Sequence, residues 1–203
     1  MLQYSTVLPH TLELLRSITD ILSVHNYRLV GGTALALQYG HRTSVDLDFF
    51  GDAHIDADDL LNLFNSLGET SMVGKSSVMA FYFIDGVKID VVCYPYEWID
   101  GPVTDKSICL ASPVDIAAMK LNAITGRGSR KDFVDLYFLL QHYSLSELLE
   151  FYHRKYQGAE EFLVLKSLNY FVDAEAQPMP HMLVDVEWEE IKRHITEQVI
   201  ALL

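Results

Sequence analysis

Cysteine and metal-binding motifs are sparse in this chain of 203 residues. Its two cysteines, Cys93 and Cys109, do not form a Cys-x-x-Cys pair, which argues against a disulfide framework and against a zinc ribbon. The eight histidines show no His-x-x-x-His spacing, so we do not expect a zinc site. Gly-x-Ser-x-Gly and Walker-type loops do not occur either, which leaves serine hydrolases and P-loop enzymes without a supporting motif.

Basic residues and long apolar runs are few as well. Fifteen Lys and Arg stand against 28 Asp and Glu, and the net charge of -13 disfavours a general nucleic-acid coat or a binder of anionic membranes. A local basic patch remains compatible with contact to RNA. No uncharged apolar run reaches about 18 residues, and residues 1–9 carry no basic residue ahead of an apolar stretch. We therefore expect a cytoplasmic protein with no membrane partner.

The composition provides for a large hydrophobic core. Hydrophobic residues make up 50% of the chain and charged residues only 21%, which excludes disorder over the whole chain. At roughly 150 residues per domain, the length predicts one large domain or one domain with a helical annex.

Residues 1–110 combine strand-like alternation with a few helical segments. Helices are predicted from Pro9 to about 25–26, over 34–39 with Thr33 as the cap, and over 56–67. Strands are predicted over 27–30, 45–49, 78–84 and 87–92, the last two joined by an Asp85-Gly86 hairpin turn. Val45 is expected to face the core, as are the aromatic residues 81–83.

After a loop at 100–102, the pattern predicts helices for the rest of the chain. Ser112 and Pro113 mark a strong helix start, and Ser144 with Glu147 forms a capping box. The helices are predicted over 112–125, 131–143, 144–156, 159–171 and 187–202. This order predicts an α+β fold, with a mixed sheet in residues 1–110 and a helical part in residues 111–203.

The densest chemical signal is a glycine pair followed by paired acids. Thirteen residues separate Gly31-Gly32 from Asp46, and Asp48 follows two positions later. Acids two residues apart on a strand point to the same side, so both carboxylates can bind one or two hard cations, and Asp90 on a later strand can supply a third. Such a site suits Mg²⁺ or Mn²⁺. For an isolated Asp-x-Asp, a solvated strand face is the more common explanation.

The two halves of this pattern have a common use. Metal ions that hold a nucleoside triphosphate (NTP) activate an attacking hydroxyl and stabilise the leaving pyrophosphate. A glycine pair lets the backbone approach phosphate closely, and the amides of a helix start favour an anion.

With the glycine pair first, then the paired acids and then an acid on a later strand, the sequence resembles the DNA polymerase β nucleotidyltransferase superfamily. Asp46, Asp48 and Asp90 match its metal carboxylates. Segments 31–36, 42–46 and 120–136 are similar to the AbiEii/AbiGii toxin nucleotidyltransferases, which include toxins of type IV toxin-antitoxin and abortive-infection systems. The resemblance spans about 27–140. It implies a polymerase-β-like nucleotidyltransferase mixed sheet with flanking helices, whose active-site cleft is completed by the helical residues 111–203.

The resemblance also implies a reaction and the residues that perform it. The enzyme would transfer a nucleoside monophosphate from an NTP to an acceptor hydroxyl, with tRNA as acceptor, Asp90 as third metal ligand or base, and a cognate antitoxin as partner. Lys120 would contact the triphosphate, and Asp132 would be needed for activity. The remaining phosphate contacts are assigned to Gly31, Gly32, Thr33, Arg42, Ser44, Arg127 and Lys131, and Asp135 is a second candidate acid.

The second motif also has a purely physical interpretation. Lys120 and Arg127 lie seven residues apart, about two helical turns, and Asp132 and Asp135 share a face of the next helix, where either could orient them. An ion pair between packed helices explains these residues as well as direct phosphate contact does. Residues 120–166 carry seven Lys or Arg against six acids, whereas the rest carries eight against 22, so only this segment can attract a polyphosphate.

Two other functions stay open at this point. Transfer to a protein or a small molecule suits the acidic surface at least as well as transfer to RNA. A catalytically silent partner-binding protein is the second alternative, although the intact acid set argues against it. His41 is expected in an exposed loop rather than near the phosphates.

Overall fold

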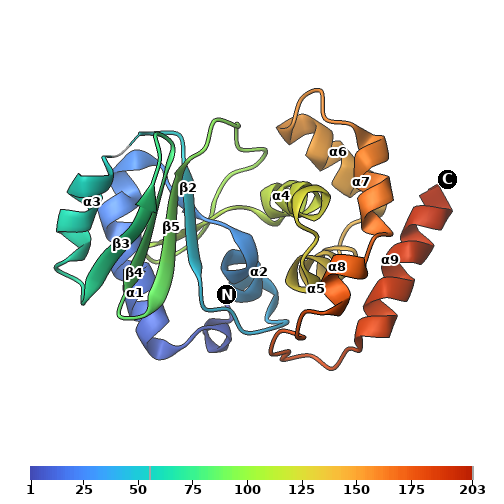
Figure 1. Ribbon diagram of the computed structural model, residues 1–203, viewed down its shortest axis with the longest axis horizontal. Coiled ribbons are helices and arrows are strands. Elements are labelled where there is room, and N and C mark those ends of the chain that lie inside the picture. Colours follow the sequence, from blue (N-terminus) through green and yellow to red (C-terminus); the bar gives the residue numbers. More distant parts are fainter. Residues whose placement is uncertain (55, 203) are drawn as a thin grey trace.

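A seven-stranded mixed sheet forms one half of the molecule (Figure 1). The computed structural model describes residues 1–54 and 56–202. The strands are β1 (Arg28–Leu29), β2 (Leu47–Gly51), β3 (Thr70–Lys75), β4 (Met79–Ile84), β5 (Val87–Cys93), β6 (Val103–Asp105) and β7 (Ile108–Leu110). Their spatial order is β3-β4-β5-β2-β1-β7-β6, and only the pairs β2–β5 and β1–β7 are parallel.

Helices cover both faces of the sheet and form the other half. Figure 1 places α1 (Pro9–Leu22) and α3 (Ala57–Phe64) on one face and α2 (Gly31–Tyr39) on the other. The C-terminal half contains α4 (Pro113–Gly126), α5 (Arg130–Leu139), α6 (Leu145–Lys155), α7 (Glu161–Leu168), α8 (Val172–Glu175) and α9 (Trp188–Leu202). Short 3-10 helices lie at Tyr4–Thr6 and Ser23–His25. No helix among the described residues is long and apolar enough to span a bilayer.

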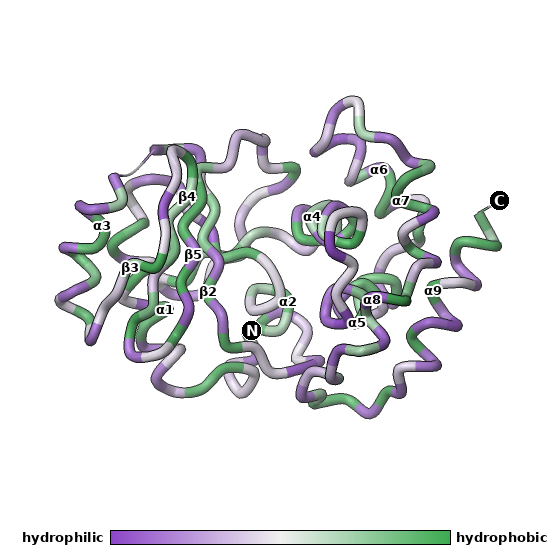
Figure 2. Tube along the Cα trace, viewed as in Figure 1, coloured by the Kyte–Doolittle hydropathy of each residue, from purple (hydrophilic) through white to green (hydrophobic). Residues whose placement is uncertain are grey.

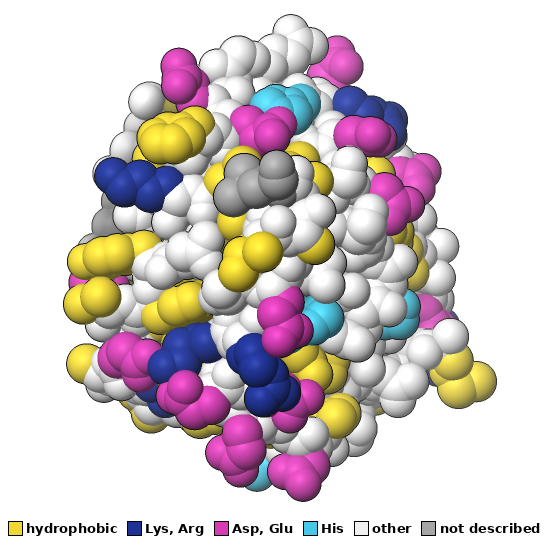
Figure 3. Space-filling view, turned by 90° about the vertical axis from the view of Figure 1, so that its right-hand side faces the viewer, with side chains coloured by type: hydrophobic (Ala, Val, Ile, Leu, Met, Phe, Trp, Pro, Cys, Tyr) yellow, Lys and Arg dark blue, Asp and Glu magenta, His cyan; other side chains and the backbone are white. Residues whose placement is uncertain are grey.

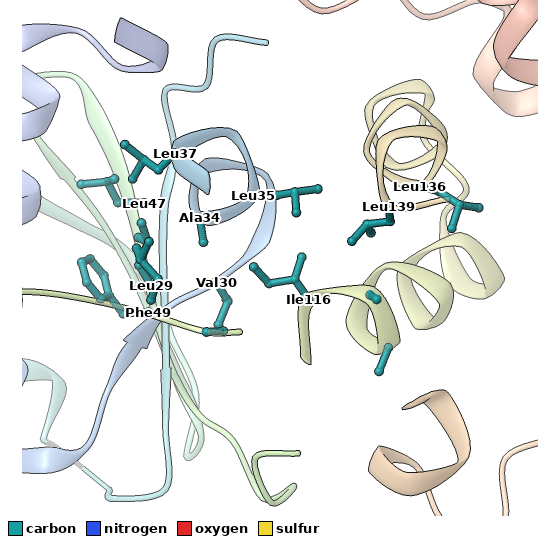
Figure 4. Close-up of a cluster of buried hydrophobic side chains, with 14 of the residues drawn as sticks. Leu29, Val30, Ala34, Leu35, Leu37, Leu47, Phe49, Ile116, Leu136 and Leu139 are labelled. Carbon is teal, nitrogen blue, oxygen red and sulfur yellow. The ribbon is translucent and has the colours of Figure 1, made fainter. Parts of the chain in front are cut away.

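One hydrophobic core joins the two halves. Figure 4 shows α2 between two groups of apolar side chains. Leu37 lies on the sheet side with Leu47, and Leu35 points toward the helical side, where Ile116 and Leu139 lie. The helix α2 therefore fixes the position of the sheet relative to α4 and α5.

Capping residues set the helix starts as predicted. The Ser112 hydroxyl accepts from the Asp115 amide at the start of α4, and Ser144 with Glu147 forms the complete capping box of α6. The outer helix α9 alternates between hydrophilic and hydrophobic residues (Figure 2), as expected for a helix with one face on the core.

Several sequence predictions were wrong in detail. Strands β3, β6 and β7 were not predicted, so strand structure continues to Leu110 instead of ending before residue 100. The helix α2 begins at Gly31, and Thr33 is not its cap. Val45 is exposed because β2 begins only at Leu47. Of the aromatic residues 81–83, Tyr82 is buried and Phe83 is exposed.

Candidate active site

Two carboxylates lie side by side on the sheet. The parallel pairing of β2 with β5 makes Asp48 and Asp90 register partners, although they are 42 positions apart in the chain. Burial, and then the neighbouring Asp90, raises the pKa of Asp48 to about 6. One Asp90 oxygen, Oδ1, is buried without a hydrogen-bond partner in the described part of the chain, whereas Oδ2 accepts from Lys88 at 2.6 Å.

Asp46 lies one residue before β2 and is 37% exposed. The nearest cation is the Lys131 ammonium, 3.9 Å away. Across residues 1–54 and 56–202, no three His, Cys, Asp or Glu side chains form a ready-made metal site. The structure thus brings together two of the three predicted carboxylates, Asp48 and Asp90, whereas Asp46 lies just before β2, two residues from Asp48.

The glycine pair allows two side chains to approach the start of α2. Gly31 has a φ of +68°, and a Cβ at this position would lie 2.7 Å from Asp48 Oδ2. A Cβ on Gly32 would overlap the guanidinium of Arg42. These glycines therefore make room for Asp48 and Arg42 directly against the backbone.

Thr33 and Ser44 connect α2 to the segment that leads into β2. The buried Thr33 hydroxyl contacts the Ser44 hydroxyl at 2.8 Å and the backbone oxygen of Asp46. The pair therefore fixes the chain next to Asp46, while Ser44 itself remains half-buried.

A buried ion network lies behind the glycines and centres on Asp135. Its carboxylate accepts from Arg42 through Nε at 2.7 Å and Nη2 at 2.9 Å, and Lys120 Nζ lies 2.5 Å from it. His41 Nε2 lies 2.8 Å from the same carboxylate. His41 is fully buried, so the expectation of an exposed loop histidine was wrong. Burial opposes ionisation of Asp135, yet Lys120 and Arg42 hold its pKa well below the ordinary value.

Asp132 forms the second centre of the network. It contacts Lys120 at 3.0 Å, Arg127 Nε at 2.8 Å and the Ser129 hydroxyl at 2.5 Å. Burial would raise the pKa of Asp132, but Lys120 and Arg127 lower it instead. Lys120 thus joins α4 to α5 through both acids, and the predicted ion pairs between packed helices are confirmed.

The Asp48–Asp90 pair and Lys120 border a cleft of about 590 Å³ between the sheet and α4. Its polar lining includes Asp48, Asp90, Lys120 and Arg127, and its apolar lining includes Phe81, Tyr94, Met119 and Tyr156. The cleft therefore combines two acids and two cations with an aromatic wall. Its lining does not include Asp46, Arg42, Lys131, Asp132 or Asp135, and of these Asp132 and Asp135 contact the lining residue Lys120.

Sequence reasoning missed the residues that position the aromatic wall. Tyr94 and Tyr156 share a hydrogen bond of 2.7 Å between their hydroxyls. Lys155, fully buried, lies over the Tyr94 ring and pairs with Asp115 at 2.8 Å. Burial lowers the pKa of Lys155. The capping signal at Ser112 and Asp115 indicated a helix start. The pairing of Asp115 with Lys155, 40 positions away, is not indicated by any local sequence pattern.

Comparison with known proteins gives matches over nearly the whole chain. The family model described as "Nucleotidyl transferase AbiEii toxin, Type IV TA system" matches residues 13–201. The uncharacterized protein aq_aa25 of Aquifex aeolicus (strain VF5) is 33% identical over 195 residues, which cover 92% of this chain and 93% of that protein.

Solved structures share the fold at low identity. The crystal structure of JHP933 from Helicobacter pylori has a TM-score of 0.60 at 19% identity, covering 97% of this chain and 93% of that chain. The solution structure of the antibiotic-resistance factor ANT(2'')-Ia has a TM-score of 0.53 at 12% identity, covering 70% and 88%. Because the family model spans nearly all of this sequence, the chain belongs to the AbiEii toxin family of nucleotidyltransferases.

Proposed function

We propose that the protein transfers a nucleoside monophosphate from an NTP to an acceptor hydroxyl and releases pyrophosphate. The observation that carries this proposal is the position of the register pair Asp48–Asp90 in one cleft with Lys120 and Arg127. The acceptor oxygen forms a bond to the α-phosphorus, the bond from this phosphorus to the bridging oxygen breaks, and the acceptor proton passes to a base. Acids and cations facing one cleft suit this charge redistribution.

The acids fit a divalent cation. Asp90 Oδ1 is buried without a hydrogen-bond partner among the described residues, and Asp48 lies directly beside it, so hard oxygen donors are available. We propose Mg²⁺ or Mn²⁺ as the ion, with Asp46 as the further ligand. A bound ion would neutralise phosphate charge and lower the pKa of the attacking hydroxyl. Asp90 then serves as third ligand or as the base.

The cations divide into an exposed and a buried group. Arg127 and Lys131, which are 61% and 49% exposed, can reach a triphosphate directly. Lys120 lines the cleft but is held by Asp132 and Asp135, so we propose that it contacts phosphate from the cleft floor.

Arg42 and Thr33 are buried and bonded to protein groups, so their proposed contribution is to hold the start of α2 in place. Gly31 and Gly32 then present the first amides of α2, and Ser44 its half-buried hydroxyl, toward the phosphates. Asp132, proposed as essential, orients Lys120 and Arg127.

For the acceptor we propose tRNA, and for the biological role a toxin with a cognate antitoxin, since the family is described as a type IV toxin. A second cavity of about 300 Å³ adjoins the cleft at Gly126 and Arg127 and also contains Lys166 and Tyr170. Its cations could bind RNA phosphate, and an aromatic ring can stack on a base. On the face shown in Figure 3, basic side chains lie among acidic ones. We propose RNA contact at this cavity, whose lining includes Arg127 and Lys166 together with Asp173.

The test is incubation with each α-labelled NTP, Mg²⁺ or Mn²⁺, and either total RNA or a cell lysate. We expect label in the tRNA fraction. Label on a protein or a small molecule would rule out tRNA as the acceptor but support the proposed nucleotidyl transfer. Absence of label with every nucleotide, ion and acceptor would contradict nucleotidyl transfer and favour a catalytically silent binding protein. For the toxin role, induced expression should stop growth, and the Asp46→Ala variant should not.

A further inference from the structure

Lys88 is the cation closest to the carboxylate pair. It lies two residues before Asp90 on β5, so both side chains project from the same side of the sheet. Its ammonium donates to Asp90 Oδ2 at 2.6 Å and lies 5.7 Å from the centre of the Phe81 ring. Sequence reasoning assigned this lysine no function.

The location of Lys88 matters because the same carboxylate is the proposed metal ligand. Asp48 and Asp90 lie in register on neighbouring strands, and two negative charges this close repel each other. A positive charge 2.6 Å from Asp90 offsets that repulsion in the metal-free protein. A divalent cation would provide the same compensation, so the ammonium and the metal compete for the negative charge of the same carboxylate.

Lys88 also has the freedom to leave. Its side chain is 39% exposed, whereas Asp90 is 15% exposed, so the ammonium reaches the pair from the solvent side on a flexible stem. Lys120, in contrast, is buried and held by two acids. Of these two lysines, only Lys88 can exchange its carboxylate for another anion at low cost.

We propose that Lys88 is a built-in counter-ion of the Asp48–Asp90 pair. A divalent cation displaces the Lys88 ammonium from Asp90, and the ammonium then binds to a bound triphosphate. The inference rests on the proposed function, since it needs the metal and the NTP in the cleft. Its consequence is that Lys88 weakens binding of the metal alone and strengthens binding of the metal together with a nucleotide. By thermodynamic linkage, the bound metal then increases the affinity for the nucleotide, and the bound nucleotide increases the affinity for the metal.

Titration calorimetry with Mn²⁺ tests the proposal without a turnover measurement. We compare the wild type with Lys88→Met, Lys88→Arg and Lys75→Met. Lys75 is the matched control, because it donates to Asp58 at the same distance of 2.6 Å in an exposed pair that involves neither Asp48 nor Asp90. Circular dichroism checks that each variant is folded.

Lys88→Met should bind Mn²⁺ about three- to fivefold more tightly than the wild type, the upper part of the range expected when a partly exposed ion pair no longer competes. Lys88→Arg, which keeps the charge, and Lys75→Met should stay within about twofold of the wild type. A non-hydrolysable NTP analogue should tighten Mn²⁺ binding more in the wild type than in Lys88→Met.

Equal or weaker Mn²⁺ binding by folded Lys88→Met would overturn this inference and leave the metal site intact. Mn²⁺ binding by none of the variants, with or without the analogue, would overturn the metal site of the proposed function together with the inference.

Discussion

A single carboxylate, Asp135, binds three side chains from two separate segments. His41 and Arg42 come from the loop after α2, and Lys120 comes from α4. Removal of this acid would leave buried cations without their counter-charge, which costs far more than the loss of an exposed pair. The network therefore stabilises the fold at the place where the sheet meets the helices.

We predict that Asp135→Asn lowers the free energy of unfolding by about 3–5 kcal/mol, the usual cost of breaking a buried pair. Urea unfolding at neutral pH measures it. Asp58→Asn is the control, because the Asp58–Lys75 pair is exposed and its loss should cost about 1 kcal/mol or less. An equal effect of the two substitutions would contradict the role of the network.

The same network sets the response to acid. The pKa values of Asp132 and Asp135 lie below the ordinary value of 3.8, so the unfolded chain takes up protons before the folded protein does. Their contribution to stability is therefore complete above pH 3.8 and is lost as the pH falls below it.

Urea unfolding between about pH 4 and pH 2 should show a steep loss of wild-type stability, and a shallower loss in Asp132→Asn, which no longer has one of the two groups. Asp58→Asn should follow the wild type. Identical slopes for the wild type and Asp132→Asn would show that other carboxylates control acid unfolding.

At the scale of elements, the start of α2 is the most constrained point. Gly31 has a positive φ and lies against Asp48, so a side chain there adds a clash to backbone strain. Gly86, in the hairpin turn, has a φ of +80°, but a Cβ there would meet nothing within 4 Å. A side chain at Gly86 would therefore cause backbone strain alone, whereas a side chain at Gly31 would cause both backbone strain and a clash with Asp48.

We predict that Gly86→Ala costs about 1 kcal/mol, from strain alone, and that Gly31→Ala costs clearly more and also lowers nucleotidyl transfer. Thermal unfolding and the labelled-NTP assay measure both effects. If Gly31→Ala matched Gly86→Ala in stability and kept wild-type transfer, the close approach of Asp48 to the glycine would have no importance.

Elements with strong local signals were predictable, and short paired strands were not. The Ser112 and Ser144 caps and the Asp85-Gly86 turn correctly predicted two helices and the β4–β5 hairpin. The β6–β7 hairpin has strands of three residues and places Lys106, not glycine, at a φ of +55°, so its sequence has no turn signal. Pairing with β1 stabilises it, and this contact is not local.

At the scale of the whole molecule, the site depends on pairings between distant segments. The alternation of residues predicted that Asp48 and Asp90 each project from one side of their strands, and the family resemblance assigned both to a metal site. The parallel register of β2 with β5, which makes them neighbours, is set by the sheet as a whole. Burial of His41 depends equally on tertiary contacts, which no sequence spacing indicates.

The cleft lies where the two halves of the molecule meet. The sheet contributes the acids, α4 contributes Lys120, and the residue after α4 contributes Arg127. The continuous core around α2 holds these groups at fixed separation. The proposed nucleotidyl transfer therefore requires the sheet, α4 and Arg127 together in the assembled chain.

The most direct test of this account is label transfer from an α-labelled NTP to the acceptor fraction by the wild type and by Asp46→Ala. Loss of one clustered negative charge should leave metal-free stability unchanged or higher, so the variant should remain folded. We predict that it loses transfer by at least about 100-fold, in keeping with loss of a metal ligand. Equal transfer by the wild type and the folded variant would contradict the assignment of Asp46 as a metal ligand in nucleotidyl transfer.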